Sequence, residues 1–306
     1  MITEKYNVNP NDPNAILYTY VLDKQPRTYQ KSKRPAIIIC PGGGYLLTAR
    51  KEGESVAVRF ASMGYHTFVL RYTTFFKEKP SNFEENLPKV NQYGYFPQQM
   101  FDLAKAMLII RQHEEEWQVD PEQIVLLGFS AGSHLCACFG ARWHEKFLSD
   151  HFQVPSSYLK PKGMILGYPL LDMSVMAKNP VIFSQDSMDI QVKYCMKCLC
   201  GSENPNIEQL KNVSPVEYVS SNTVQAFIWQ SYNDKTTHVQ NSLNFANALV
   251  KAGVSCEMHI FRDGVHGASL CDEVCASEKE HLNSACAKWV SMAYTWLKGI
   301  LSEEGN

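Results

Sequence analysis

One serine in this sequence stands where it could act as a nucleophile. Ser130 lies in the segment 128–132 (Gly-Phe-Ser-Ala-Gly), which directly follows the apolar run 124–127 (Ile-Val-Leu-Leu). This order predicts a buried strand, a sharp turn and a helix, with the serine at the apex of the turn. The glycines two residues before and after the serine permit the close backbone approach that such a turn needs. A serine exposed on a strained turn is suited to attack a carbonyl carbon.

A serine nucleophile needs a base, and the chain offers a histidine after its last expected strand. His266 lies in the segment 263–267 (Asp-Gly-Val-His-Gly), a glycine-flanked loop from which an imidazole can reach the serine. His238 is the main alternative, because it lies close to the acid candidate. His134, one turn along the helix after the serine, is expected to pack or to hydrogen-bond locally.

The third group is a carboxylate that orients the base. Asp234 ends the segment 231–234 (Ser-Tyr-Asn-Asp), just past an expected strand that ends near Gln230. A carboxylate there can hold the imidazole in one tautomer and stabilise the imidazolium. Asp263, three residues before the histidine, is the alternative acid. Asp234 could also be a plain turn residue, since Asn-Asp is common in turns.

Three glycines follow the expected strand 36–40, in the segment 41–45 (Pro-Gly-Gly-Gly-Tyr). Consecutive glycines let successive backbone N–H groups point into one concavity, as an oxyanion hole requires. We expect the amides of Gly43 and Gly44 to act there. Ala131 should supply a further N–H donor, at the positive end of the helix that follows the serine. A phosphate-binding loop is excluded, because no Gly-Lys-Ser/Thr follows the glycines.

The elements that position these groups alternate between apolar strand-like runs and amphipathic helix-like runs, which predicts an α/β fold with a largely parallel sheet. The segments 72–97 and 172–214 break this alternation. We interpret 172–214 as a small lid inserted in one domain that covers residues 1–306, and 72–97 as a loop near it. The expected strands are 16–22 (an edge strand), 36–40, 65–72, 124–127, 164–168, 224–230 and 255–261, and the expected helices are 55–63, 97–117, 131–143, 239–252 and 282–301.

Composition narrows the classes of partner. The net charge is −2 and no basic stripe interleaves with aromatic residues, so nucleic-acid binding is not expected. No apolar run is long enough to cross a bilayer, so no membrane partner is expected. The segment 1–7 lacks the basic and then apolar pattern of a signal peptide, which favours a cytoplasmic location. The sequence leaves a homo-oligomer open.

The ten cysteines are scattered, and without a secretion signal they indicate reduced thiols rather than a disulfide framework. The only cluster is Cys195, Cys198 and Cys200. Zinc would need a fourth ligand, for which Cys271 or Cys275 could serve, so metal or redox chemistry stays an alternative to buried thiols.

Five motifs together resemble the acetyl esterase/lipase branch of the α/β-hydrolases, close to bacterial carbohydrate acetylesterases and BD-FAE-type enzymes. These motifs are 41–45, Arg71-Tyr72, 128–134 (Gly-Phe-Ser-Ala-Gly-Ser-His), Asn233-Asp234 and 264–267 (Gly-Val-His-Gly). The resemblance implies an α/β-hydrolase fold and a triad of Ser130, Asp234 and His266. It also implies no metal or organic cofactor, and short-chain acyl esters, often acetyl groups on sugars, as substrates.

Four positions depart from the pattern of these relatives. Pro41 replaces a histidine found before the glycines in lipase-type relatives, which fits the sugar-esterase branch better. Ser133 stands where a glycine is usual, and Thr237-His238 stands where relatives often carry Val-Pro, which keeps His238 open as an alternative base.

The predicted function is therefore a serine carboxylesterase that hydrolyses short-chain acyl esters of small molecules, with acetylated sugars or xylo-oligosaccharides as substrates and an acyl-enzyme on Ser130. A peptidase or amidase of the same fold is one alternative. A non-catalytic homologue that binds a ligand is another.

Overall fold

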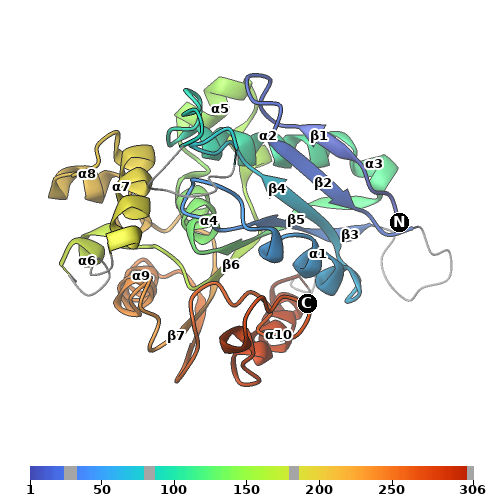
Figure 1. The fold of residues 1–306 in the computed structure, drawn as a ribbon. Coiled ribbons are helices and arrows are strands. Elements are labelled where there is room, and N and C mark those ends of the chain that lie inside the picture. Colours follow the sequence, from blue (N-terminus) through green and yellow to red (C-terminus); the bar gives the residue numbers. More distant parts are fainter. Residues whose placement is uncertain (24–32, 79–86, 179–185, 302–306) are drawn as a thin grey trace.

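The computed structural model describes residues 1–23, 33–78, 87–178 and 186–301. Its described part contains a sheet of eight strands in the order β1-β2-β4-β3-β5-β6-β7-β8 (Figure 1). The strands from β4 to β8 run parallel, whereas β2 pairs antiparallel with both β1 and β4. This largely parallel sheet flanked by helices confirms the predicted α/β-hydrolase fold class.

The central strands are buried on both faces, because helices cover both sides of a parallel sheet. One strand prediction is wrong: 16–22 is not an edge strand, since β1 pairs outside it. β1 is only three residues long, too short for a periodic pattern to show it. The strands are β1 (Lys5–Asn7), β2 (Ile16–Tyr20), β3 (Arg34–Cys40), β4 (His66–Arg71), β5 (Val119–Phe129), β6 (Gly163–Gly167), β7 (Ala226–Ser231) and β8 (Cys256–Phe261).

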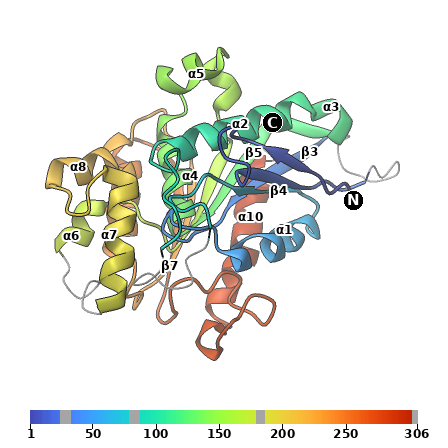
Figure 2. The same cartoon turned by 45° about the horizontal axis from the view of Figure 1, so that its top comes forward.

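Two helical layers enclose the sheet. Helices α1 and α10 pack on one face, and α2, α4 and α9 pack on the other (Figure 2). Within the described ranges, every helix falls short of the length and apolar content that crossing a bilayer requires. The helices are α1 (Glu54–Ala61), α2 (Gln98–Gln112), α3 (Glu114–Trp117), α4 (Ala131–Arg142), α5 (Lys146–Phe152), α6 (Met173–Lys178), α7 (Asp186–Cys200), α8 (Ile207–Asn212), α9 (Gln240–Lys251) and α10 (Trp289–Leu301).

Two helix predictions need correction. The expected helix 97–117 is interrupted at His113, which separates α2 from the short α3. The expected helix 282–301 begins only at Trp289. The side chain of Asn283 accepts hydrogen bonds from the backbone N–H groups of Ala285 (3.1 Å) and Cys286 (3.0 Å). These local bonds favour a turn over a helix.

The segment between β6 and β7 carries α6, α7 and α8, where the sequence places a lid at 172–214. Residues 179–185 of that segment lie outside the described residues. Helix α7 lies against the irregular segment 72–97: the N–H of Phe96 donates to the Cys198 carbonyl (3.1 Å), and the Cys198 thiol donates to the Gly94 carbonyl (3.1 Å). The division into one domain with a lid stays a prediction.

Candidate active site

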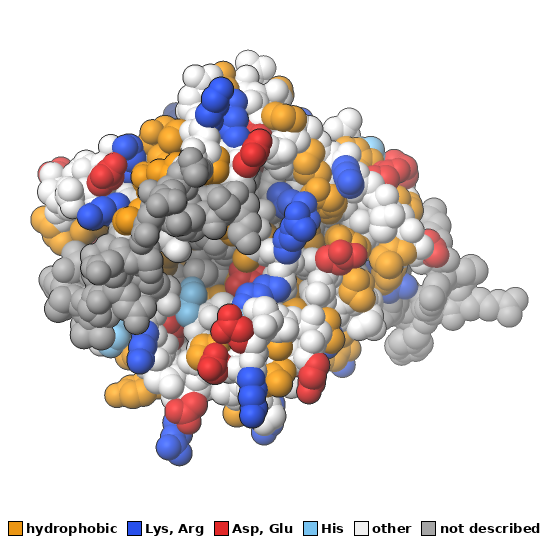
Figure 3. Space-filling view, in the orientation of Figure 1, with side chains coloured by type: hydrophobic (Ala, Val, Ile, Leu, Met, Phe, Trp, Pro, Cys, Tyr) orange, Lys and Arg blue, Asp and Glu red, His pale blue; other side chains and the backbone are white. Residues whose placement is uncertain are grey.

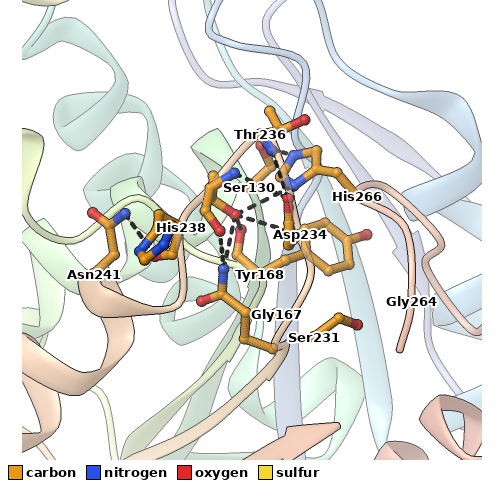
Figure 4. Close-up of polar contacts among 12 residues, drawn as sticks. Ser130, Gly167, Tyr168, Ser231, Asp234, Thr236, His238, Asn241, Gly264 and His266 are labelled. Carbon is orange, nitrogen blue, oxygen red and sulfur yellow. Dashed lines mark hydrogen bonds and ion pairs between the residues drawn. The ribbon is translucent and has the colours of Figure 1, made fainter. Parts of the chain in front are cut away.

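Ser130 occupies a strained turn at the carboxyl end of β5. Its φ of 52° and ψ of −119° place a non-glycine residue in a sparsely populated region. Its N–H donates to the Gly167 carbonyl (3.0 Å), which fixes the turn against β6 (Figure 4). A Cβ at Gly132 would lie 1.9 Å from the Cys40 carbonyl oxygen, so only glycine fits where α4 passes β3.

The structure brings Ser130, Asp234 and His266 together, although they follow three different strands (Figure 4). The Ser130 hydroxyl lies 2.9 Å from His266 Nε2, and His266 Nδ1 lies 2.9 Å from Asp234 Oδ2. Because a carboxylate only accepts, Nδ1 carries the imidazole proton and Nε2 is free to accept the serine proton. The Asp234 side chain is 1% exposed and that of His266 is 18% exposed.

The charges of this pair shift both pKa values. Burial opposes protonation of His266, but the nearby Asp234 carboxylate and its hydrogen bond outweigh burial and raise the histidine pKa. Burial likewise opposes ionisation of Asp234. The His266 charge and the hydrogen bonds outweigh that effect, so the pKa of Asp234 lies below its usual range. Each group of the pair therefore stabilises the charged form of the other.

Three donors from the following turn hold the Asp234 carboxylate. The N–H groups of Thr236 and Thr237 donate to Oδ1 at 2.8 and 3.0 Å, and the Thr237 hydroxyl lies 3.0 Å from Oδ2. The same hydroxyl lies 3.3 Å from His266 Nδ1 and 3.1 Å from the Tyr168 carbonyl. The Asn-Asp turn signal could have indicated the backbone bonds, but Thr237 stands out in the sequence only as a departure from the pattern of its relatives.

The glycine loop that carries two of the expected oxyanion donors passes beside Ser130, because a Cβ at Gly42 would lie 2.8 Å from Ser130 Cβ. The third expected donor, Ala131, directly follows the serine. Among the described residues, no acceptor is paired with the N–H groups of Gly43, Gly44 or Ala131. Gly44 has φ +63°, and a Cβ there would lie 2.6 Å from Cys195 Sγ of α7. The role of these amides as oxyanion donors stays a prediction.

A buried glutamate that no sequence pattern indicates lies between the glycine loop and the histidine. Glu52 is 2% exposed; its Oε2 accepts from the Gly42 N–H (2.7 Å) and its Oε1 from the Tyr168 hydroxyl (2.6 Å). The Tyr168 ring packs edge-on against His266, with centroids 4.9 Å apart. Tyr168 also accepts from the Ser269 N–H (3.1 Å) in the histidine loop. Burial raises the pKa of Glu52 despite these hydrogen bonds.

The alternative residues lie away from the triad. His238 Nδ1 accepts from the Gln240 N–H (3.2 Å) at the start of α9, and the Asp263 side chain pairs with Arg262 (3.3 Å). His134 is buried, which lowers its pKa to about 4. Its Nε2–H donates to the Val213 carbonyl (2.6 Å), so its Nδ1 accepts from the Tyr45 hydroxyl (2.7 Å).

The cysteine cluster does not converge on a common point. Cys195 faces Gly44, whereas the Cys198 thiol donates to the Gly94 carbonyl. Burial raises the pKa of Cys195 to about 12 and that of Cys200 to about 11. Within the described part of the chain, no three His, Cys, Asp or Glu side chains are grouped as a metal site, and each of the ten cysteines is a free thiol.

Comparison with known proteins gives relatives of similar sequence. The chain is 29% identical over 241 residues to endo-1,4-beta-xylanase B of Butyrivibrio fibrisolvens, covering 79% of this chain and 33% of that protein. It is 24% identical over 273 residues to an acetylxylan esterase of Xylanibacter ruminicola, covering 86% of this chain and 46% of that protein. The chain thus spans less than half the length of both relatives.

A solved structure matches nearly the whole chain. The acetyl ester-xyloside bifunctional hydrolase from Caldicellulosiruptor lactoaceticus has a TM-score of 0.73 and 27% identity, covering 97% of this chain and 96% of that one. The family model described as BD-FAE matches residues 22–249. Since that match covers well over half of the sequence, the chain belongs to the BD-FAE family.

Proposed function

We propose that this protein is a serine carboxylesterase that removes short acyl groups, above all acetyl groups on sugars or xylo-oligosaccharides. The observation that carries this proposal is the pair of 2.9 Å contacts that place His266 between the Ser130 hydroxyl and the Asp234 carboxylate. This arrangement supplies a nucleophile, a base and an orienting acid in one line.

In the first half of the reaction, the Ser130 oxygen attacks the ester carbonyl carbon while His266 Nε2 takes the hydroxyl proton. The carbonyl oxygen becomes an oxyanion, which the N–H groups of Gly43, Gly44 and Ala131 stabilise. The intermediate then breaks the carbon–oxygen bond to the alcohol. His266 returns its proton to that oxygen, so the alcohol leaves neutral and the acyl group stays on Ser130.

In the second half, a water molecule attacks the acyl carbon while His266 Nε2 takes a proton from it. The same amides hold the second oxyanion. The bond between the acyl carbon and the Ser130 oxygen then breaks, and His266 protonates that oxygen. The products are a carboxylic acid and the restored serine, and throughout the cycle Asp234 stabilises the imidazolium without taking its proton.

The preference for acetylated sugars is supported by the names of the matched proteins, which include an acetylxylan esterase and an acetyl ester-xyloside hydrolase. Pro41 before the glycines agrees with this branch of esterases. The cytoplasmic location and a homo-oligomeric state stay predictions.

Turnover of p-nitrophenyl acetate tests the reaction class. Wild-type protein should hydrolyse it, and Ser130→Ala should lose activity by about 10⁴-fold or more, because the nucleophile is gone. A fluorophosphonate probe should label wild type but not Ser130→Ala. An alanine variant with wild-type turnover would refute the mechanism. A panel of acetylated xylo-oligosaccharides, longer-chain esters and aminoacyl amides then tests the substrate class.

A further inference from the structure

A cleft lined by basic side chains lies beside the glycine loop. Its volume is about 950 Å³, and its walls come from residues 46–51 and from the adjoining ends of β2 and β4. We call it the basic cleft. Figure 3 shows Lys and Arg side chains in the middle of one face of the molecule, with Asp and Glu side chains among them. Its charged lining residues are Lys5, Arg50, Lys51, Arg71, Lys77 and a single acid, Glu78.

This excess of cations contrasts with the chain as a whole, whose net charge is −2. The Arg71 guanidinium lies over the Tyr18 ring, 4.5 Å from the centroid. It also donates one hydrogen bond to the Tyr18 hydroxyl (3.1 Å). Lys5 lies 5.4 Å from the same ring centroid.

Arg71 is half-buried, yet it pairs with no carboxylate among the residues that the structure describes. A guanidinium held on a ring keeps its remaining N–H groups in a fixed fork that matches a carboxylate. A carboxylate that enters the cleft would therefore meet N–H donors that are already oriented. The neighbouring lysine and arginine side chains would also attract it.

The basic cleft lies on the same edge of the sheet as the nucleophile. Arg71 ends β4, two places from β5 in the sheet, so at about 4.8 Å per strand the backbones of these two strand ends are about 10 Å apart. Lys51 connects the two sites: it lines the cleft, and its Nζ lies 4.0 Å from the position a Cβ would take on Gly267, next to His266. A short acyl group on Ser130 cannot reach Arg71. The part of an ester that can reach it is the alcohol.

We propose that the basic cleft binds a carboxylate on the alcohol part of the ester, so that the enzyme prefers acylated acidic oligosaccharides over neutral ones. This inference rests on the proposed esterase function and extends it to the substrate class. The carboxylate accepts from the Arg71 guanidinium, while the other cations attract the acidic chain over a longer distance.

The test compares two acetylated xylo-oligosaccharides that differ only in one glucuronate side group. The measured quantity is the ratio of kcat/KM for the acidic substrate to kcat/KM for the neutral one, determined for each variant. Wild type should give a ratio above one, and Arg71→Gln should lower it about five- to tenfold, as expected for the loss of a charge-assisted hydrogen bond. Raising NaCl from about 20 mM to about 500 mM should also lower the wild-type ratio.

The matched control is Lys298→Gln, which removes an exposed cation that rests on the Tyr294 ring of α10, outside the cleft. It should leave the ratio unchanged. A wild-type ratio of one, or an equal ratio in wild type and Arg71→Gln, would overturn the proposal. The proposal would also be overturned if Arg71→Gln lowered the ratio of kcat/KM for p-nitrophenyl succinate to kcat/KM for p-nitrophenyl acetate by the same factor. The anion would then bind on the acyl side of the ester. If wild type hydrolyses neither acetylated oligosaccharide but turns over p-nitrophenyl acetate, the proposed substrate class fails; if it turns over none of the three, the esterase function itself fails.

Discussion

Removing the Glu52 carboxylate should uncouple the glycine loop from the histidine. In Glu52→Ala the N–H of Gly42 and the hydroxyl of Tyr168 lose their acceptor, and both groups are buried. An unsatisfied buried donor costs about 1–3 kcal/mol, so the two together should lower the free energy of unfolding by about 2–6 kcal/mol. That is a large part of the total stability of a typical domain, about 5–15 kcal/mol.

Glu52→Gln isolates the charge from the packing, because it keeps the volume and one carbonyl acceptor. The Tyr168 hydroxyl can turn to accept from the new amide, so the stability loss should be about 1 kcal/mol. The negative charge of Glu52 contributes to the raised pKa of His266. Without that charge, the pH at which kcat/KM reaches half its maximum should move down, because the neutral histidine is the active base.

The assay combines urea unfolding with the pH profile of p-nitrophenyl acetate hydrolysis. The matched control is Glu54, an exposed glutamate two residues along the chain, changed to Ala and to Gln. We expect Glu52→Ala to lower kcat about tenfold or more, since the loop that carries the oxyanion donors loses its anchor. If the two alanine variants are equally stable and active, the reasoning is wrong. If Glu52→Ala is less stable than wild type but Glu52→Gln has the pH profile of wild type, Glu52 acts through packing alone.

Asp234→Asn should lower kcat about 10³–10⁴-fold and shift the rising limb of the kcat/KM profile to lower pH, since Asp234 raises the pKa of His266. Gly44→Ala should lower both stability and kcat, because φ is +63° and a Cβ would lie 2.6 Å from Cys195 Sγ. The double variant with Cys195→Ala should recover part of that loss, and no recovery would contradict the contact. Thr237→Val should lower kcat/KM about fivefold to tenfold through the loss of one hydrogen bond to Asp234, and Thr237→Ser should restore it.

The sequence predicted the candidate triad because each member follows a strand, and parallel strands place their carboxyl ends at one edge of the sheet. The serine also carries a local signal, since the flanking glycines are required by backbone contacts such as that of Gly132 with Cys40. These are properties of short segments. They can be read without knowing which strands are neighbours.

Glu52 and Tyr168 could not be predicted in this way. A glutamate just before a helix is ordinarily a solvated residue, and nothing near it in sequence indicates burial. Its burial follows from a contact with Tyr168, which lies 116 positions away at the end of β6. The start of α10 was missed for a related reason, because the hydrogen bonds of the Asn283 side chain outweigh the apolar pattern.

The strand order explains why a contact between the glycine loop and the histidine loop is needed. The glycine loop follows β3, beside β5, whereas the histidine loop follows β8, three places away on the other side. At about 4.8 Å per strand, the chain after β8 must return about 14 Å to bring His266 to Ser130. Ser269 secures that return, because its N–H donates to the Tyr168 hydroxyl (3.1 Å) and its hydroxyl donates to the Lys51 carbonyl (3.0 Å). Since Tyr168 in turn donates to Glu52, which accepts from Gly42, one buried network holds the histidine loop and the glycine loop. A displacement of either loop should therefore displace the other.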